Sequence, residues 1–198
     1  MKRTNVAIFA SGEGTNAQNI IRYFKNVNSI NIRLVISNNF FAKVLVHAEK
    51  AGIERVSSNE KYFFESDILV EELKGAKIDW IILAGFLWKI SDKVIKAFPD
   101  KIINIHPALL PKFGGKGMYG MNVHRAVIDA KETESGITIH YVNEKYDEGK
   151  IIAQYKCDIE ENETPETLAN KVRQLEHEYY PKIIEREIYD CRLEQHIE

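Results

Sequence analysis

Short apolar runs alternate with amphipathic segments through the first half of the chain. The apolar runs cover residues 6–10, 32–36, 80–84 and 102–105. The segments between them have the apolar spacing of helices, at residues 16–24, 42–51, 60–73 and 91–98. Strands and helices that alternate in this way predict βαβ units, in which right-handed crossovers build a mostly parallel sheet with helices on both faces.

The pattern changes after residue 136. Ile137, Ile139 and Tyr141 recur with the period of a strand, and a second strand is expected at residues 151–155. These two segments predict an antiparallel or mixed edge on the sheet.

The last long segment is typical of a helix that begins at Pro165. Thr164 is a suitable N-cap, and proline is favoured at the first helical position. Apolar positions continue at helical spacing through Leu168, Val172, Leu175 and Tyr179. We expect Pro181 to kink or interrupt this helix, and the charged tail from about residue 185 to fray.

Length and composition indicate one α/β domain over residues 1–198, with no linker or repeat. Hydrophobic residues make up 44% and charged residues 28%, and no segment approaches the roughly 20 apolar residues that span a bilayer. The net charge of −2 argues against a nucleic-acid partner. The apolar run at residues 6–10 is shorter than the roughly 7–15 residues of a secretory core, so we expect a first strand.

Cysteine and histidine usage narrows the chemistry. Cys157 and Cys191 are the only cysteines, which argues against a disulfide framework and favours a reducing, cytoplasmic location. No metal-ligand spacing is present, so we expect no metal. Four histidines are expected to be noncatalytic: His47, His124, His177 and His196.

A glycine-rich loop follows the first predicted strand. Gly12 and Gly14 precede a helical segment, where free N–H groups and the helix dipole favour an anion. A dinucleotide fingerprint would need an acidic residue about 20 residues further on. The chain has the sequence Ser-Asn-Asn at residues 37–39 instead, which argues against NAD. A tight turn without a ligand is the alternative.

Asn104 and His106 lie two residues apart at the end of a predicted strand, so both project from the same face. Pro107 then ends the strand, because proline offers no N–H to a ladder. Together with Asp147, an amide and an imidazole could stabilise an oxyanion and relay protons. Taken singly, His106 is better explained as a structural residue and Asp147 as a turn residue. Their occurrence together with Pro107, the Leu-Pro pair at residues 110–111 and Gly136 favours the catalytic interpretation instead.

Three motifs resemble folate-dependent formyltransferases: the segment at residues 103–111, the segment at residues 136–142 with Asp147 and Gly149, and the loop at residues 10–16. The likeness is strongest to the branch that acts on glycinamide ribonucleotide. It implies a Rossmann-like sheet with a long C-terminal helix, and 10-formyltetrahydrofolate as co-substrate without a metal. The implied reaction, in de novo purine biosynthesis, moves the formyl group to an amine through an oxyanionic tetrahedral intermediate.

The resemblance also implies residue roles. The catalytic residues would be Asn104, His106 and Asp147, with His140 in support. The ribonucleotide would contact Gly14, Thr15, Asn16, Arg173 and Glu176. The folate would contact Leu87, Trp88, Lys89, Ile90, Asn104, Asn143, Glu144, Lys145, Tyr146 and Asp147. Asp147 close to His106 would raise the imidazole pKa. Relatives place a basic residue for the folate tail near Asn59, where this chain offers Lys61.

Other interpretations remain open. A sugar-amine formyltransferase could share the catalytic trio, and a noncatalytic nucleotide-binding module could share the fold. The glycine-rich stretch at residues 114–121, which contains Lys116, is either a lid over the amine substrate or a surface loop. The expected partners are small-molecule substrates, with neither nucleic acid nor membrane, for a monomer or homodimer.

Overall fold

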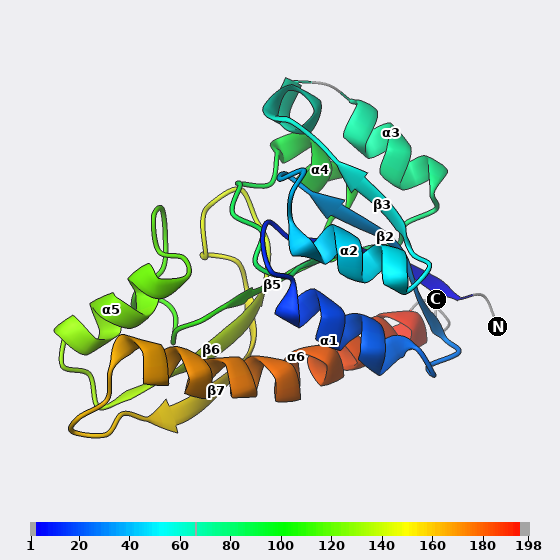
Figure 1. The fold of residues 1–198 in the computed structure, drawn as a ribbon. Coiled ribbons are helices and arrows are strands. Elements are labelled where there is room, and N and C mark those ends of the chain that lie inside the picture. Colours follow the sequence, from blue (N-terminus) through cyan, green and yellow to red (C-terminus); the bar gives the residue numbers. More distant parts are fainter. Residues whose placement is uncertain (1–2, 66, 195–198) are drawn as a thin grey trace.

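The computed structural model describes residues 3–65 and 67–194, and a seven-stranded sheet forms its centre (Figure 1). The strand order is β3-β2-β1-β4-β5-β6-β7. The strands are β1 (Thr4–Phe9), β2 (Ile30–Ser37), β3 (Glu54–Ser57), β4 (Trp80–Leu83), β5 (Ile102–His106), β6 (Glu134–Tyr141) and β7 (Ile151–Asp158). The first five are parallel, and β6 runs antiparallel to both β5 and β7. The predicted parallel sheet and antiparallel edge are confirmed.

Helices cover both faces of the sheet. They are α1 (Thr15–Phe24), α2 (Lys43–Lys50), the π-helical turn η1 (Lys61–Glu65), α3 (Ile68–Gly75), α4 (Asp92–Ala97), α5 (Met121–Asp129) and α6 (Pro165–Glu194). One hydrophobic core lies under α1, α2, α5 and α6, and a second lies under η1, α3 and α4. In β1, Val6 and Ile8 enter the first core while Ala7 and Phe9 enter the second, as the alternation of a strand requires.

The structure differs from the predicted elements at three places. The helix expected over residues 60–73 is divided into η1 and α3, and residue 66 lies outside the described residues. Strand β3 was not predicted, because its sequence Glu-Arg-Val-Ser has no apolar run. Helix α5 was not predicted either, although Val123, His124 and Val127 form its buried side.

The long helix α6 continues through Pro181 to Glu194, so the predicted interruption is wrong. Proline has no N–H for the carbonyl four residues earlier, which belongs to His177. The side chain of Asn19 on α1 donates a 2.7 Å hydrogen bond to that carbonyl and replaces the missing donor. The fraying predicted from residue 185 is also wrong within the described residues, because Ile188 is buried in the core. Residues 195–198 lie outside them.

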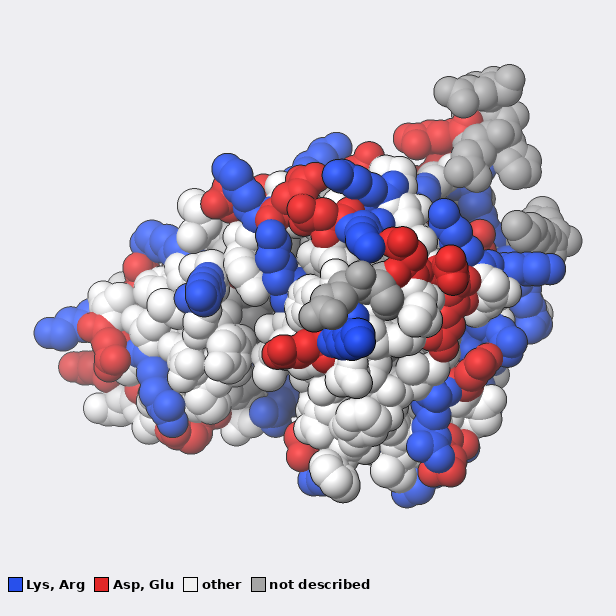
Figure 2. Space-filling model, turned by 90° about the horizontal axis from the view of Figure 1, so that it is seen from above, with Lys and Arg blue, Asp and Glu red and all other residues white. Residues whose placement is uncertain are grey.

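The surface seen from above mixes charges of both signs, with Lys and Arg beside Asp and Glu over the visible face (Figure 2). Within residues 3–65 and 67–194, none of the helices has the combination of length and apolar content needed to cross a bilayer.

Candidate active site

A cleft of about 660 Å³ opens at the carboxyl ends of β4 and β5. Its walls come from the loops after these strands, the segment after β6, α5 and α6. The chain extends the sheet in one direction from β1 through β2 and β3, and in the other from β4 onward. Ligands of open α/β sheets bind where the strand order switches in this way.

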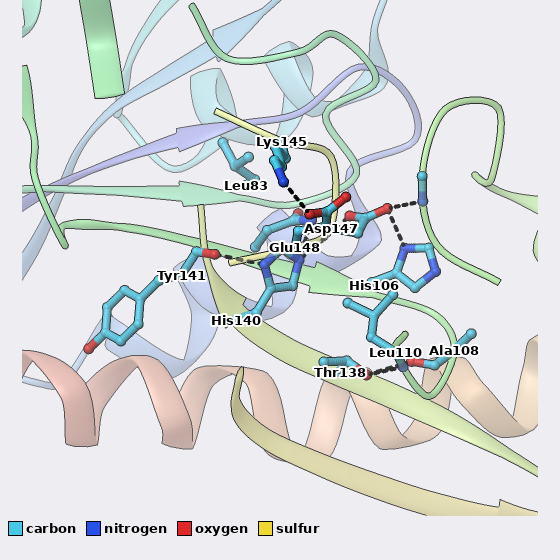
Figure 3. Close-up of polar contacts among 12 residues, drawn as sticks. Leu83, His106, Ala108, Leu110, Thr138, His140, Tyr141, Lys145, Asp147 and Glu148 are labelled. Carbon is cyan, nitrogen blue, oxygen red and sulfur yellow. Dashed lines mark hydrogen bonds and ion pairs between the residues drawn. The ribbon is translucent and has the colours of Figure 1, made fainter. Parts of the chain in front are cut away.

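His106 is the last residue of β5 and lies almost fully inside the protein, with 3% of its surface exposed. Its Nε2 is 2.8 Å from the carbonyl oxygen of Phe113, which can only accept, so Nε2 donates. The other ring nitrogen, Nδ1, faces Oδ2 of Asp147 at 3.5 Å (Figure 3). Nδ1 is therefore the nitrogen at which this histidine can gain and lose a proton.

Asp147 lies on the loop between β6 and β7. The backbone N–H of Gly115 donates a 2.9 Å hydrogen bond to its Oδ2, and Oδ1 lies 3.6 Å from Nε2 of His140. A side chain at Gly149 would collide with the carbonyl oxygen of Tyr141, because its Cβ would be only 1.7 Å away. Glycine at that position lets the loop fold back and bring the carboxylate to His106.

Asn104 and His140 form the adjacent part of the network. Nδ1 of His140 donates to the carbonyl oxygen of Tyr141 at 2.8 Å, which leaves its Nε2 facing Asn104. The side-chain amide of Asn104 donates to this Nε2 at 3.2 Å. Asn104 and His140 are also paired across β5 and β6. The pairing fixes the Asn104 amide at the cleft wall.

The protonation of the pair follows from burial and charge. Burial lowers the pKa of His106 and outweighs Asp147, which raises it. Asp147 raises the imidazole pKa as expected, but the net pKa of His106 is lowered, because desolvation exceeds the attraction of one carboxylate. Burial raises the pKa of Asp147, but His140, His106 and the Gly115 N–H together bring it below its ordinary value. At neutral pH the site holds a neutral imidazole beside a carboxylate.

The turn after His106 is fastened to β6 by Thr138. The Thr138 hydroxyl donates to the carbonyl oxygen of Ala108 at 2.7 Å and accepts from the N–H of Leu110 at 2.9 Å (Figure 3). Both bonds are buried, where each net contribution is about 1 kcal/mol. They hold the backbone that leads to Phe113, the partner of His106.

The loop after β4 forms the wall predicted to contact folate. The N–H of Leu87 donates to the hydroxyl of Ser11 at 2.9 Å, and the N–H of Ser11 donates to the carbonyl oxygen of Gly85 at 3.0 Å. Phe86 stacks on Phe63 with ring centres 5.0 Å apart. These contacts join the loop to the glycine-rich loop and to the second core.

The opposite wall contains Asn16, Arg173 and Glu176. The amide of Asn16 donates to Oε2 of Glu176 at 2.9 Å, while Oδ1 of Asn16 is enclosed with no partner among the described residues. Burial raises the pKa of Glu176, although Asn16 and Arg173 act in the opposite direction. The wall therefore offers a carboxylate, an amide and a guanidinium to a polar ligand.

Most predicted site residues line this cleft. Those that do are Asn16, Leu87, Trp88, Lys89, Ile90, Asn104, His106, His140, Asn143, Lys145, Tyr146, Asp147, Arg173 and Glu176. Gly14, Thr15 and Glu144 are not in its wall, and neither are Asn59 and Lys61. Gly14 is the N-cap of α1, with a left-handed φ of 74°, and a side chain there would collide with Val44.

The sequence analysis missed one polar residue of the cleft, His124 on the first turn of α5. It is 6% exposed, and its Nδ1 is enclosed without a hydrogen-bond partner in the described part of the chain. Burial, Arg173 and His106 lower its pKa to about 4. A lone histidine in an unpredicted helix gave no signal in the sequence. Among the described residues, no cluster of metal-ligating side chains was found.

Comparison with known proteins agrees with this geometry. The family described as "Formyl transferase" matches residues 4–184. Phosphoribosylglycinamide formyltransferase of Bacillus subtilis (strain 168) is 38% identical, over 91% of this chain and 92% of that protein. The chloroplastic phosphoribosylglycinamide formyltransferase of Arabidopsis thaliana is also 38% identical, over 92% of this chain. The chain spans 65% of that plant relative's length.

The fold has solved counterparts. The crystal structure of glycinamide ribonucleotide transformylase 1 from Geobacillus kaustophilus superposes with a TM-score of 0.84 at 35% identity, covering 92% of this chain and 97% of that one. The sequence match and the shared fold both extend over nearly the whole chain. The chain therefore belongs to the formyl transferase family, in its phosphoribosylglycinamide formyltransferase branch.

Proposed function

We propose that the protein transfers a formyl group from 10-formyltetrahydrofolate to the amine of glycinamide ribonucleotide, in de novo purine biosynthesis. The observation that carries the proposal is the convergence of Asn104, His106 and Asp147 in one cleft. Asn104 and His106 end a parallel strand, and Asp147 comes from a loop about 40 residues later, folded back onto them.

The reaction needs one base, one donor to an oxyanion and one proton transfer. The amine nitrogen attacks the formyl carbon, and the carbonyl electron pair moves to oxygen. The bond from that carbon to the folate nitrogen then breaks, and this nitrogen takes up a proton. Neutral His106 accepts the proton lost by the amine at Nδ1, since Nε2 is held by Phe113. The imidazolium then donates it to the departing nitrogen.

Asn104 and Asp147 stabilise the two charges that form during these steps, the negative oxyanion and the positive imidazolium. The Asn104 amide is a neutral donor for the oxyanion, a contribution typically worth 10²–10³ in rate. Asp147 stabilises the imidazolium that forms beside it, while the Gly115 N–H fixes the carboxylate. The chemistry proposed here uses only these side chains and the two substrates.

The two reactants fit opposite walls of the cleft. The loop of Leu87, Trp88, Lys89 and Ile90 and the segment of Asn143, Glu144, Lys145 and Tyr146 would hold the folate. Asn16, Arg173 and Glu176 would hold the ribonucleotide. Its phosphate would bind the free N–H groups at the start of α1, beside Gly14 and Thr15. In this arrangement the catalytic trio would lie beside the attacking amine and the formyl carbon.

A direct assay tests the proposal. The purified protein is mixed with 10-formyltetrahydrofolate and glycinamide ribonucleotide, and the absorbance of the deformylated folate is followed. We expect turnover with this amine and none with an amino sugar nucleotide. Turnover with the sugar nucleotide but not with the ribonucleotide would identify a sugar-amine formyltransferase. No turnover with either amine would favour a noncatalytic module.

The remaining expectations are proposals of the same kind. We propose a cytoplasmic enzyme that acts as a monomer or homodimer on small molecules. The loop at residues 114–121 contributes Lys116 to the cleft wall, which supports its proposed role as a lid over the amine substrate.

A further inference from the structure

A second cavity of about 740 Å³ lies between α1 and α2, over the start of β2. One face of α1 and the last turn of α2 form its sides. The cavity shares no lining residue with the catalytic cleft. Its volume falls within the range of about 300–1,000 Å³ that is typical of small-molecule sites.

The charged residues of its wall are all basic. They are Arg3, Arg22, Lys25 and Lys50, together with His47 and His177, and no Asp or Glu lines the cavity. None of the four cations forms an ion pair with a described carboxylate. Arg3 and Arg22 donate only to neutral oxygens, of Asn28 and Asn19. This wall differs from the mixed surface of Figure 2, where acidic side chains lie beside the basic ones.

Helix ends do not account for so much charge. Arg22 and Lys25 are close to the C-terminal end of α1, and Lys50 ends α2, where cations stabilise the helix. Each helix end contributes about half a negative charge, so two ends offset about one of the four cations. A net positive charge of about three remains for an anionic ligand.

The floor of the cavity is apolar. Ile21, Ile32 and Ile53 are half-buried in it, beside the buried Phe24 and Ile30. His177 adds an enclosed Nε2 that has no hydrogen-bond partner in the described residues. Burial and two arginines, Arg173 and Arg22, lower the pKa of this histidine, so its ring stays neutral. The cavity thus combines a cationic rim with an apolar floor and one unpaired ring nitrogen.

We propose that this cavity binds a small phosphorylated molecule with a flat apolar portion, that is, a nucleotide. The phosphates would contact Arg22, Lys25 and Lys50, and the base would cover the isoleucines of the floor. The cavity shares no lining residue with the catalytic cleft, although Thr15, beside which the ribonucleotide phosphate is proposed to bind, belongs to its wall. ATP binding here does not depend on the reaction proposed for the cleft.

Calorimetric titration with ATP tests the proposal. The full chain is compared with the double variant Arg22→Gln, Lys25→Gln and with a control, Lys74→Gln, Lys96→Gln. The control also removes two exposed cations from last helical turns, outside both cavities. We expect ATP binding by the full chain, a Kd raised about tenfold or more in the first variant, and an unchanged Kd in the control.

Three results would overturn the proposal. They are no ATP binding by the full chain, equal loss of affinity in both double variants, and complete displacement of ATP by glycinamide ribonucleotide. The last result would place ATP in the cleft. Urea unfolding of each variant shows that it is folded before titration.

Discussion

The side-chain amide of Asn16 donates a 2.9 Å hydrogen bond to Oε2 of Glu176, across 160 residues of sequence. The contact joins the start of α1 to the middle of α6 at the edge of the catalytic cleft. The carboxylate is costly to keep ionised there, since burial raises its pKa. A buried charge without an ionic partner at hydrogen-bond distance is typical of a group placed for a ligand.

Replacement of Glu176 by Gln should therefore stabilise the protein while weakening the ribonucleotide complex. Because the pKa of Glu176 is raised in the folded state, its ionisation does not reduce the free energy of unfolding at low pH, where the acid is protonated in both states. The free energy of unfolding falls as the pH rises through the folded-state pKa. We expect the free energy of unfolding of the variant to be higher than that of the native protein at pH 7 and equal to it at pH 4. The KM for the ribonucleotide should rise roughly tenfold. Lower stability at pH 7 would contradict this account.

Replacement of His106 by Asn should lower kcat by about 10²–10³. His106 takes up the proton of the amine at Nδ1, and an asparagine side chain has no group basic enough to do this. The dissociation constant of the ribonucleotide, measured by calorimetry, should stay within about twofold, which shows an intact fold. Steady-state rates near those of the native protein would remove His106 from the mechanism.

Replacement of Asp147 by Asn should lower kcat and move the acid limb of the kcat/KM profile to lower pH. Asp147 raises the pKa of His106, so its loss lets burial lower that pKa further. The neighbouring Glu148→Gln is the matched control, since it removes an exposed carboxylate paired with Lys145 at 3.1 Å. An unmoved profile in Asp147→Asn would show that the carboxylate does not act on the imidazole.

Replacement of His124 by Gln should reduce the sensitivity of the protein to acid. Its folded-state pKa of about 4 lies below the ordinary value of about 6.5. Protonation of His124 therefore costs no stability above about pH 6.5, and it lowers the free energy of unfolding as the pH falls toward 4. This histidine accounts for up to about 3 kcal/mol of that loss. Urea unfolding at pH 7 and pH 4.5 measures the difference. Equal acid sensitivity in the two proteins would refute it.

Replacement of Asn19 by Leu should cost about 1–3 kcal/mol of stability, because the carbonyl of His177 loses its only described donor. In a Pro181→Ala background the cost should be smaller, since alanine restores the helical N–H. A double-mutant cycle by urea unfolding measures this coupling. Equal costs in both backgrounds would show that Asn19 does not compensate for the proline.

The buried strands could be predicted because most of their consecutive residues are apolar. β1, β4, β5 and the second half of β2 are covered on both faces, so nearly every side chain there faces a core. The edge strand β3 escapes such reasoning, since Glu54 and Arg55 are exposed and only pairing with β2 defines it. The continuous helix across Pro181 depends on a donor from another helix, which no local pattern reveals.

The catalytic trio could be proposed from motifs, but the direction in which the pKa of His106 is shifted could not. The sequence places Asn104 and His106 on one strand face and leaves Asp147 about 40 residues away. The direction of the His106 pKa depends on how deeply the ring is buried, which is a property of the whole fold. For the same reason, the sequence could not predict that His124 lines the cleft, because this depends on where α5 packs.

The hydroxyl of Tyr180 reaches the carbonyl oxygens of both Leu83 and Ile103, at 2.8 and 3.1 Å. Helix α6 is thus tied to β4 and β5, the two strands whose carboxyl ends form the cleft. A ribosome delivers this helix after every other part of the cleft. A nascent chain would therefore form the side of the cleft built on β4 and β5 first, and would gain the wall of Arg173 and Glu176 only after this helix had docked.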